Sequence, residues 1–305
     1  MVSNEAVRVA QQRIAGRIRR TPVLETGPVA YKLEFLQHAG SFKTRGMVNQ
    51  ILAGAERGAL PAAGIIAASG GNAGLAAAYA ARELGVPAEV YVPENAPAVK
   101  VAKLAKLGAE VTQAGSEYAE AFEAATVQAG VTGALFCHAY DDPEMVAGNG
   151  TLGLELLEQL PAGFDTVLVA VGGGGLIAGV AAALPPGIRV VAVEPVSCTA
   201  LHSALAAGGP VDVPVSGVAA DSLGARRVGT IAYETVVARG VGSVLVDDQA
   251  IVDARRLLWE DFRIVVEHGT AAAQAALSSG AYQPAAGERV VVLLCGANTN
   301  PVDLA

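Results

Sequence analysis

The sequence has little charge, few aromatic side chains and only three cysteines. Charged residues make up 16% of its 305 residues and aromatic residues 5%, whereas hydrophobic residues make up 52%. This much apolar material can build a packed core and is not typical of a disordered chain. The formal net charge is −8, so the basic footprint that nucleic-acid binding needs is missing.

Cys137, Cys198 and Cys295 lie far apart along the chain. No two of them have the spacing of metal ligands, and an odd number does not suit a disulfide framework. We therefore expect a reducing compartment. No signal-peptide pattern opens the sequence and no apolar run approaches the length of a membrane span, so we predict a cytoplasmic protein without a membrane segment.

Short apolar, β-branched runs alternate with alanine-rich helical stretches along most of the chain. The expected strands are 64–68, 88–92, 135–138, 166–171, 189–193 and 290–294. The expected helices are 73–84, 97–107, 116–129, 144–160, 176–184 and 249–265. This order predicts an α/β fold with two open, twisted parallel-sheet domains and helices on both faces. We expect a small domain over 44–140 and a large domain built from 1–43 and 141–305.

Four successive glycines, Gly172 to Gly175, follow the expected strand 166–171 and precede a helix that opens at Leu176. Without Cβ atoms, the backbone N–H groups of this polyglycine turn can close around an anion at a helix N-terminus. A phosphate is the expected guest. The alternative is a tight turn that binds nothing. A dinucleotide site is disfavoured, because the turn does not match G-x-G-x-x-G cleanly.

A second glycine loop, Ser69-Gly70-Gly71-Asn72-Ala73, follows the expected strand 64–68 and enters a helix. It offers a hydroxyl, an amide and free helix N–H groups, although an ordinary asparagine cap would use the same residues. Two such anion sites in one protein would suit a cofactor phosphate and a substrate carboxylate.

Lys43 follows Phe42 in the segment Gly40 to Gly46, before a helical run expected to start near Met47. Burial beside an aromatic ring would lower the pKa of a lysine, and the neutral amine is the nucleophile that forms Schiff bases. A solvated lysine is the alternative. Cys295 ends the most apolar strand, at the edge where such sheets bind ligands. It is either a small buried hydrophobe or a neighbour of a ring nitrogen.

Together these segments resemble the fold-type II pyridoxal-phosphate (PLP) enzymes, whose fold is of the tryptophan synthase β type. The match includes Lys32-Leu-Glu-Phe-Leu-Gln37, Gly40-Ser-Phe-Lys-Thr-Arg-Gly46, Ser69 to Pro87, Val171 to Gly179 and Leu294-Cys-Gly-Ala-Asn298. Within that group the chain is most similar to the serine/threonine dehydratases, and Cys295 points to the liver-type serine dehydratases.

The resemblance implies a role for each of these segments. It implies that Lys43 forms the Schiff base with PLP, that Phe42 lies near the pyridine ring and that Cys295 faces the ring nitrogen. Asn72 would bind the 3′ oxygen. The phosphate would be held by Gly172, Gly173, Gly174, Gly175 and Leu176. The substrate carboxylate would be held by Ser69, Gly71, Asn72 and Ala73.

The implied reaction is a β-elimination that converts L-serine or L-threonine to pyruvate or 2-oxobutanoate and ammonia, in a protein expected to be a homodimer. Serine racemisation, dehydration of hydroxyaspartate or phenylserine, and β-replacement of the cysteine-synthase type remain alternatives. Ala73 opposes the last, because cysteine synthases typically have threonine there. A regulatory protein that only binds PLP and a nicotinamide dehydrogenase are more distant alternatives.

The resemblance also implies a monovalent cation, such as K⁺, beside the polyglycine turn. Glu194 would supply a carboxylate, and backbone oxygens near Cys198, Leu223 and Ala225 would complete the site. Hard cations prefer such oxygen ligands. A capping or surface role for Glu194 is the equal alternative. Glu267 matches a family position near the active site.

Overall fold

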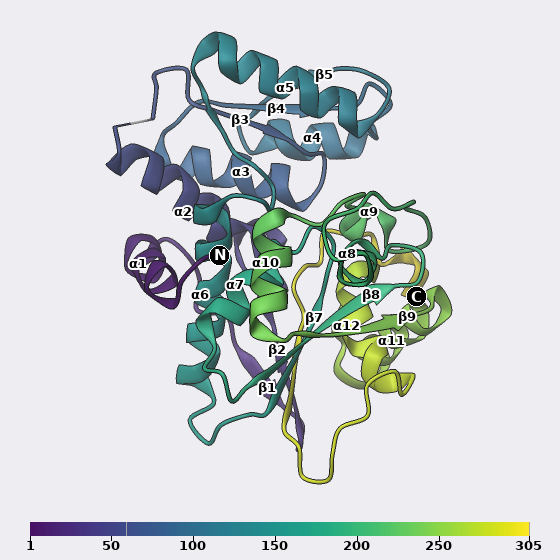
Figure 1. The fold of residues 1–305 in the computed structure, drawn as a ribbon. Helices are drawn as coiled ribbons and strands as arrows, with labels where there is room; N and C mark the ends of the chain where they lie inside the picture. The colour runs from purple at the N-terminus through teal and green to yellow at the C-terminus, as the bar shows by residue number, and fades with distance from the viewer. Residues whose placement is uncertain (59, 305) are drawn as a thin grey trace.

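The structure, a computed structural model, describes residues 1–58 and 60–304. It contains a six-stranded sheet and a four-stranded sheet, one above the other in Figure 1. Helices pack on both faces of each sheet, as the strand and helix order predicted. The small sheet uses one continuous stretch of chain, whereas the large sheet is built from both ends. The domain boundaries at 44 and 140 stay a prediction.

The large sheet has the strand order β1-β2-β10-β7-β8-β9. Its strands are β1 Val23–Glu25, β2 Val29–Lys32, β7 Thr166–Ala170, β8 Arg189–Pro195, β9 Gly242–Val246 and β10 Val290–Leu293. All neighbours are parallel except β1 and β2, which form an antiparallel hairpin around Gly27, with a φ of +87°. This hairpin was not predicted from the sequence, because three- and four-residue strands leave too short a pattern to detect.

The small sheet has the strand order β5-β4-β3-β6, and all neighbours are parallel. Its strands are β3 Ile65–Ala68, β4 Ala88–Val92, β5 Glu110–Gln113 and β6 Leu135–Phe136. Sequence analysis missed β5, whose end residues are exposed and whose middle residues are only partly buried.

The helices connect and cover these strands. The α-helices are α1 Asn4–Ile14, α2 Lys43–Glu56, α3 Asn72–Leu84, α4 Ala98–Lys106, α5 Tyr118–Thr132, α6 Pro143–Gln159, α7 Gly175–Ala183, α8 Ala200–Ala207, α9 Ala220–Leu223, α10 Thr230–Arg239, α11 Asp248–Phe262 and α12 His268–Ser278. The 3₁₀ turns are η1 Glu34–Leu36, η2 His38–Gly40 and η3 Pro301–Leu304.

Several helix ends differ from the sequence-based expectation, and the cause is clear for two of them. Helix α2 begins at Lys43 rather than near Met47, because buried ion pairs hold the polar residues of its first turn inside the protein. Helix α11 ends at Phe262 rather than at residue 265. Arg263 adopts a left-handed conformation with a φ of +58°, and its N–H donates back to the carbonyl of Trp259.

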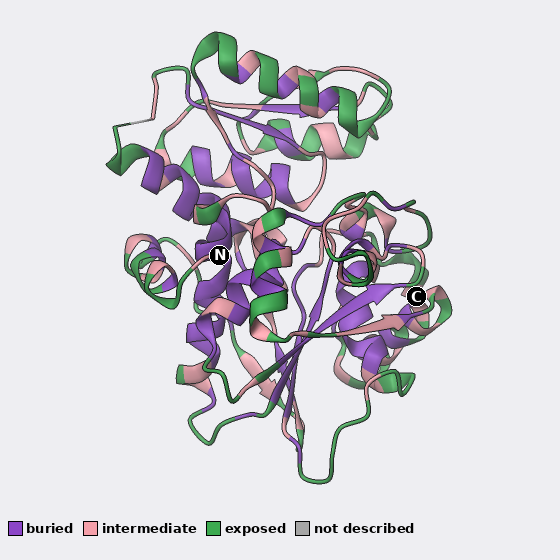
Figure 2. Ribbon diagram, in the orientation of Figure 1, coloured by how far each residue is buried: buried purple, intermediate pink, exposed green. Residues whose placement is uncertain are grey.

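The core of the large sheet explains why its central strands are continuously apolar. Val167 and Val169 of β7 face the layer of α6, α7 and α10, whereas Leu168 and Ala170 face α11 and α12. The central strands and the adjoining helix faces are buried in Figure 2. Each buried valine or leucine side chain contributes about 1.5–3 kcal/mol to folding. This rigid sheet fixes the position of the polyglycine turn, which follows β7.

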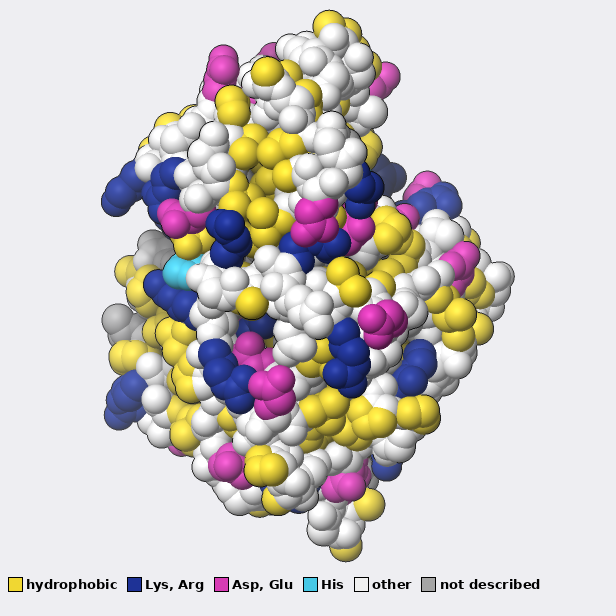
Figure 3. All heavy atoms as spheres, turned by 90° about the vertical axis from the view of Figure 1, so that its left-hand side faces the viewer, with side chains coloured by type: hydrophobic (Ala, Val, Ile, Leu, Met, Phe, Trp, Pro, Cys, Tyr) yellow, Lys and Arg dark blue, Asp and Glu magenta, His cyan; other side chains and the backbone are white. Residues whose placement is uncertain are grey.

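On the face drawn in Figure 3, acidic and basic side chains are interspersed and do not gather into a basic stripe. This agrees with the net charge of −8. Among residues 1–58 and 60–304, no helix is both long and apolar enough to cross a membrane.

Candidate active site

A cavity of about 720 Å³ lies between the two sheets. The small sheet lines it with the Ser69–Ala73 loop, parts of α4 and α5, and residues after β6. The large sheet contributes residues beyond the carboxyl ends of β7 and β10, where parallel sheets place their ligand sites. The predicted cofactor and substrate residues all line this one cavity: Phe42, Lys43, Ser69, Gly71, Asn72, Ala73, Gly172, Gly173, Gly174, Gly175, Leu176 and Cys295.

Lys43 is the first residue of α2, and its side chain faces the cavity. Its Nζ donates a hydrogen bond of 2.6 Å to the carbonyl oxygen of Ala139 and lies 5.0 Å from the ring centroid of Phe42. Burial lowers the pKa of Lys43 to about 8, although Cys295 and Glu267 oppose the shift. Roughly a tenth of this amine is therefore neutral, and nucleophilic, at pH 7, far more than for an ordinary lysine.

Buried ion pairs hold the helix that carries Lys43. Arg45, two residues further along the same helix, pairs with Glu34 at 2.6 Å and with Glu155 of α6 at 3.0 Å. Glu155 also accepts a 2.5 Å bond from Lys32 of β2. These four charges tie α2 to β2 and α6, so Lys43 stands on a fixed support. From the sequence, Lys32, Glu34 and Arg45 were read only as parts of motifs, and Glu155 was not singled out.

The polyglycine turn fits a phosphate because side chains are excluded from it. A Cβ built on Gly173 would lie 2.4 Å from the ring of Tyr140, and one on Gly175 would lie 2.7 Å from the Tyr140 carbonyl oxygen. Gly174 has a φ of +87° and caps α7. The first N–H groups of α7 have no carbonyl partner within the helix, so they point a positive helix end at the cavity. A phosphate is the chemical group that this end of the cavity suits.

The Ser69–Ala73 loop forms the opposite side of the cavity. Ser69 Oγ accepts the N–H of Gly71, and α3 begins at Asn72. A Cβ on Gly74 would lie 1.9 Å from the Ser69 carbonyl oxygen, so only glycine allows this tight entry into the helix. The exposed N–H groups of the first helical turn can bind a carboxylate.

Asn72 is held by two side chains of the large-sheet half. Its Nδ2 donates to Glu267 Oε1 at 2.6 Å, and its Oδ1 accepts from Asn298 Nδ2 at 2.6 Å. Burial raises the pKa of Glu267 to about 7. Sequence analysis placed Glu267 near the site but gave Asn298 no role of its own, since a loop asparagine carries no sign of its partners.

Cys295 lies between the lysine segment and α12. Its carbonyl oxygen accepts the N–H of Phe42 at 2.9 Å, and its Sγ lies 3.3 Å from Oγ1 of Thr270. Burial raises the pKa of the thiol to about 12, so the sulfur stays protonated at physiological pH. The Cys295 side chain thus presents a neutral thiol to the cavity, where an aspartate would present a negative charge.

An aromatic wall, formed by Tyr118, Phe122, His138 and Tyr140, lines the small-sheet side of the cavity. The ring of His138 lies 5.7 Å from Phe122 and 4.9 Å from Tyr140, both edge-on. Its Nδ1 accepts the N–H groups of Tyr140 and Asp141 at 3.3 and 2.8 Å. His138 is therefore a neutral imidazole with its proton on Nε2. The sequence did not reveal this wall.

Only some of the residues predicted to bind a cation lie together beside the polyglycine turn. Leu223 and Ala225 line the cavity, and Leu223 lies beside Gly172, whereas Glu194 and Cys198 do not line it. The two oxygens of Glu194 accept the N–H groups of Leu201 and His202 at 2.8 and 2.7 Å, which caps α8. Across the described residues, no three His, Cys, Asp or Glu side chains form a metal-binding group.

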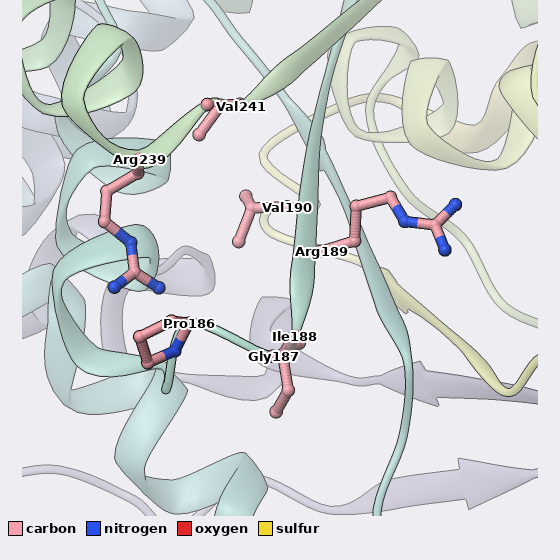
Figure 4. Close-up of a pocket in the computed structure, with 8 residues that line it drawn as sticks. Pro186, Gly187, Ile188, Arg189, Val190, Arg239 and Val241 are labelled. Carbon is pink, nitrogen blue, oxygen red and sulfur yellow. The ribbon is translucent and has the colours of Figure 1, made fainter.

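A smaller cavity of about 220 Å³ lies at the other end of the large sheet, where β8 and β9 begin. Figure 4 shows Arg239 beside Pro186, whereas Arg189 extends to the other side of β8. Arg239 donates to the carbonyl oxygen of Leu184 at 2.8 Å. None of the residues predicted for cofactor or substrate lines this cavity.

Comparison with known proteins identifies the chemistry. The family model "Pyridoxal-phosphate dependent enzyme" matches residues 14–296. The chain belongs to this family. The lysine, the polyglycine turn and the neutral thiol around one cavity fit the cofactor that the family binds.

Several relatives of this PLP-dependent chain are named for a reaction. It is 36% identical to an "L-threonine ammonia-lyase" of Geobacter sulfurreducens, over 97% of this chain and 76% of that protein. It is 37% identical to a "Phenylserine dehydratase" of Ralstonia pickettii, over 98% of this chain and 94% of that protein. The solved structure of maize serine racemase superimposes on this chain with a TM-score of 0.92 and 33% sequence identity. The match covers 99% of this chain and 95% of the maize chain.

Proposed function

We propose that this protein is a PLP-dependent ammonia-lyase that converts L-serine or L-threonine to the 2-oxo acid and ammonia. The observation that carries the proposal is the meeting of Lys43, the Ser69–Ala73 loop and the polyglycine turn in one cavity. Relatives at 34–36% identity over at least 89% of this chain are named for threonine ammonia-lyase or dehydratase activity.

When bound, PLP supplies the electron sink that accepts the electron pair of the substrate Cα–H bond. In our proposal Lys43 would hold the cofactor, and its free amine would take the substrate Cα proton at Nζ. Its pKa of about 8 suits this work, because a base is most effective when its pKa lies near the working pH.

The remaining residues orient the reactants. In the proposal the N–H groups at the start of α3, with Ser69, bind the substrate carboxylate, and the start of α7 binds the cofactor phosphate. The neutral Cys295 thiol would not hold a proton firmly on a ring nitrogen placed beside it. A ring that is a weaker electron sink favours loss of the β-hydroxyl over transamination.

Racemisation is the nearest alternative on this fold. It needs a second acid–base group on the face of the substrate opposite Lys43. Gly70 and Gly71 bring no side chain to the Ser69–Ala73 loop, which leaves the Ser69 hydroxyl as its one group able to exchange a proton. This supports elimination as the main reaction, with racemisation a minor one.

The aromatic wall favours a second candidate substrate, a β-hydroxy amino acid with an aromatic β-substituent. Tyr118, Phe122 and Tyr140 can pack against such a ring, and one relative is named for phenylserine dehydration. Serine and threonine leave this wall uncovered.

The test is a panel of L- and D-serine, L- and D-threonine, threo-3-hydroxyaspartate and phenylserine, assayed for ammonia and 2-oxo acid. We expect release from L-serine or L-threonine without an added thiol. Product that forms only with a thiol nucleophile would place the enzyme among the transferases. Conversion of L- to D-serine that is faster than ammonia release would make it a racemase.

Three further properties belong to the proposal. We propose a homodimer located in the cytoplasm, which sedimentation and cell fractionation can test. We also propose a K⁺ site at Glu194, Cys198, Leu223 and Ala225. Burial raises the pKa of Glu194 to about 7, and a bound cation would keep that carboxylate ionised. Thermal unfolding in KCl and in choline chloride tests this site, with a higher midpoint expected in KCl.

A further inference from the structure

Asn298 lies where three chain segments meet at the edge of the cavity. Its Nδ2 donates to Asn72 Oδ1 at 2.6 Å and to the carbonyl oxygen of Ala39 at 2.8 Å. The next residue, Gly40, packs so closely that a Cβ there would lie 2.8 Å from Asn298 Oδ1. Asn298 thus joins the segment before Lys43 to the helix start that carries Asn72.

These bonds have only one possible direction. A backbone carbonyl oxygen can only accept, so Ala39 requires the NH₂ side of the Asn298 amide. The same NH₂ group then faces Asn72, which must turn its oxygen toward Asn298. This places Asn72 Nδ2 against Glu267, where it donates at 2.6 Å. An amide carries two N–H donors, so one N–H of Asn72 remains for a ligand in the cavity.

The backbone at Ala39 is shaped to serve this arrangement. Ala39 has a φ of +56° and Gly40 a φ of +73°. A non-glycine residue rarely adopts such a conformation, and a residue held in one next to a binding site suggests a functional constraint. Here the conformation aims the Ala39 carbonyl at Asn298, and the Ala297 N–H fixes the Gly40 carbonyl at 3.0 Å.

We propose that Asn298 is a positioning residue that sets the orientation of the Asn72 amide and keeps one Asn72 N–H free to donate to a cofactor ring oxygen. The proposal rests on the proposed role of Asn72 in cofactor binding. It does not depend on which amino acid is the substrate. Without Asn298, the bond to Glu267 alone orients the Asn72 amide, so the donor that it offers to PLP is less firmly held.

The test compares the Kd for PLP of apoenzymes carrying N298A, N298S and N298D, measured by absorbance and by quenching of the single tryptophan, Trp259. Asp has the shape of Asn but no donor, so it faces the Ala39 and Asn72 oxygens with a third acceptor. We expect PLP binding to weaken about threefold in N298S, tenfold in N298A and more than tenfold in N298D. If Asn298 only fills space, N298D binds PLP like the wild type and N298A is the weakest, which would overturn the proposal.

A double-mutant cycle identifies the partner. In an N72A background, N298A should change the Kd for PLP less than twofold, because the group that Asn298 orients is gone. Full additivity of the two substitutions would also overturn the proposal. If N72A alone leaves the Kd unchanged, the inference fails while the ammonia-lyase activity can still stand. Conversely, if the enzyme proves not to be an ammonia-lyase, the expected order of the Kd values for PLP does not change.

A matched control is Asn4 of α1, whose Nδ2 also donates to two oxygens, the backbone carbonyls of Ala182 and Ala183, at 3.2 and 2.8 Å. Asn4 does not line the cavity. N4D should therefore leave the Kd for PLP unchanged. The unfolding midpoint of each apoenzyme separates a loss of fold from a loss of binding. A variant whose Kd changes only in proportion to its stability would contradict a positioning role.

Discussion

The side-chain nitrogen of Lys43 donates a 2.6 Å hydrogen bond to the carbonyl oxygen of Ala139. Lys43 begins α2, whereas Ala139 follows the last strand of the small sheet, so the bond closes one side of the cavity. It orients the amine while the surrounding protein lowers the pKa of Lys43 to about 8. A lysine held in this way is ready to act as a nucleophile.

The rate at which apoenzyme takes up PLP should therefore rise with pH through about 8 and level off above it. Only the neutral amine attacks an aldehyde, and a lowered pKa makes that form available at lower pH. An unperturbed lysine, with a pKa of about 10.4, would give a rate that still rises beyond pH 10. Stopped-flow absorbance measures the rate, with N-acetyl-lysine amide as the reference for the titration of PLP itself.

Replacing Glu155 should destabilise the protein far more than replacing Glu158 on the same helix. E155A leaves Lys32 and Arg45 short of a buried partner, which costs about 3–5 kcal/mol. E158A removes an exposed pair with Arg20 and costs less than about 1 kcal/mol. Urea unfolding of the two variants measures the difference. Equal losses would show that the buried network does not anchor α2.

Adding one methyl group to the polyglycine turn should weaken PLP binding. The Cβ of G173A would lie 2.4–2.5 Å from three atoms of the Tyr140 ring, so the turn or the ring must move. We expect at least a tenfold higher Kd for PLP. In G187A the new Cβ meets no atom within 4 Å, so its Kd should match the wild type. A wild-type Kd for G173A would mean that the turn does not hold the phosphate.

The sequence was informative wherever a pattern was continuous and local. The apolar runs of β7, β8 and β10 and the two glycine loops gave the fold class and the ends of the cavity. The hairpin β1–β2 and the edge strands β5 and β9 escaped, because short or half-exposed strands have no continuous apolar run. The start of α2 escaped because Arg45 is buried through pairing rather than through apolarity.

Within the site, the residues that the sequence motifs indicated do lie together. The residues whose contribution depends only on where the fold places them were not predicted. The Ala139 carbonyl is a backbone group that any residue would supply, so the identity of residue 139 does not predict its contact with Lys43. Asn298 and the aromatic wall depend on contacts between segments that are 16 to 259 residues apart. Such contacts become visible only once the two sheets are placed against each other.

The central claim concerns one amine, and the chain offers five lysines from which to choose: Lys32, Lys43, Lys100, Lys103 and Lys106. Reduction of the PLP-loaded protein with borohydride fixes the cofactor to its lysine, and peptide mass spectrometry then locates it. We predict that the added mass lies on the peptide containing Lys43 alone and is absent from K43A. Label on another lysine, or no label on any peptide, would contradict the account.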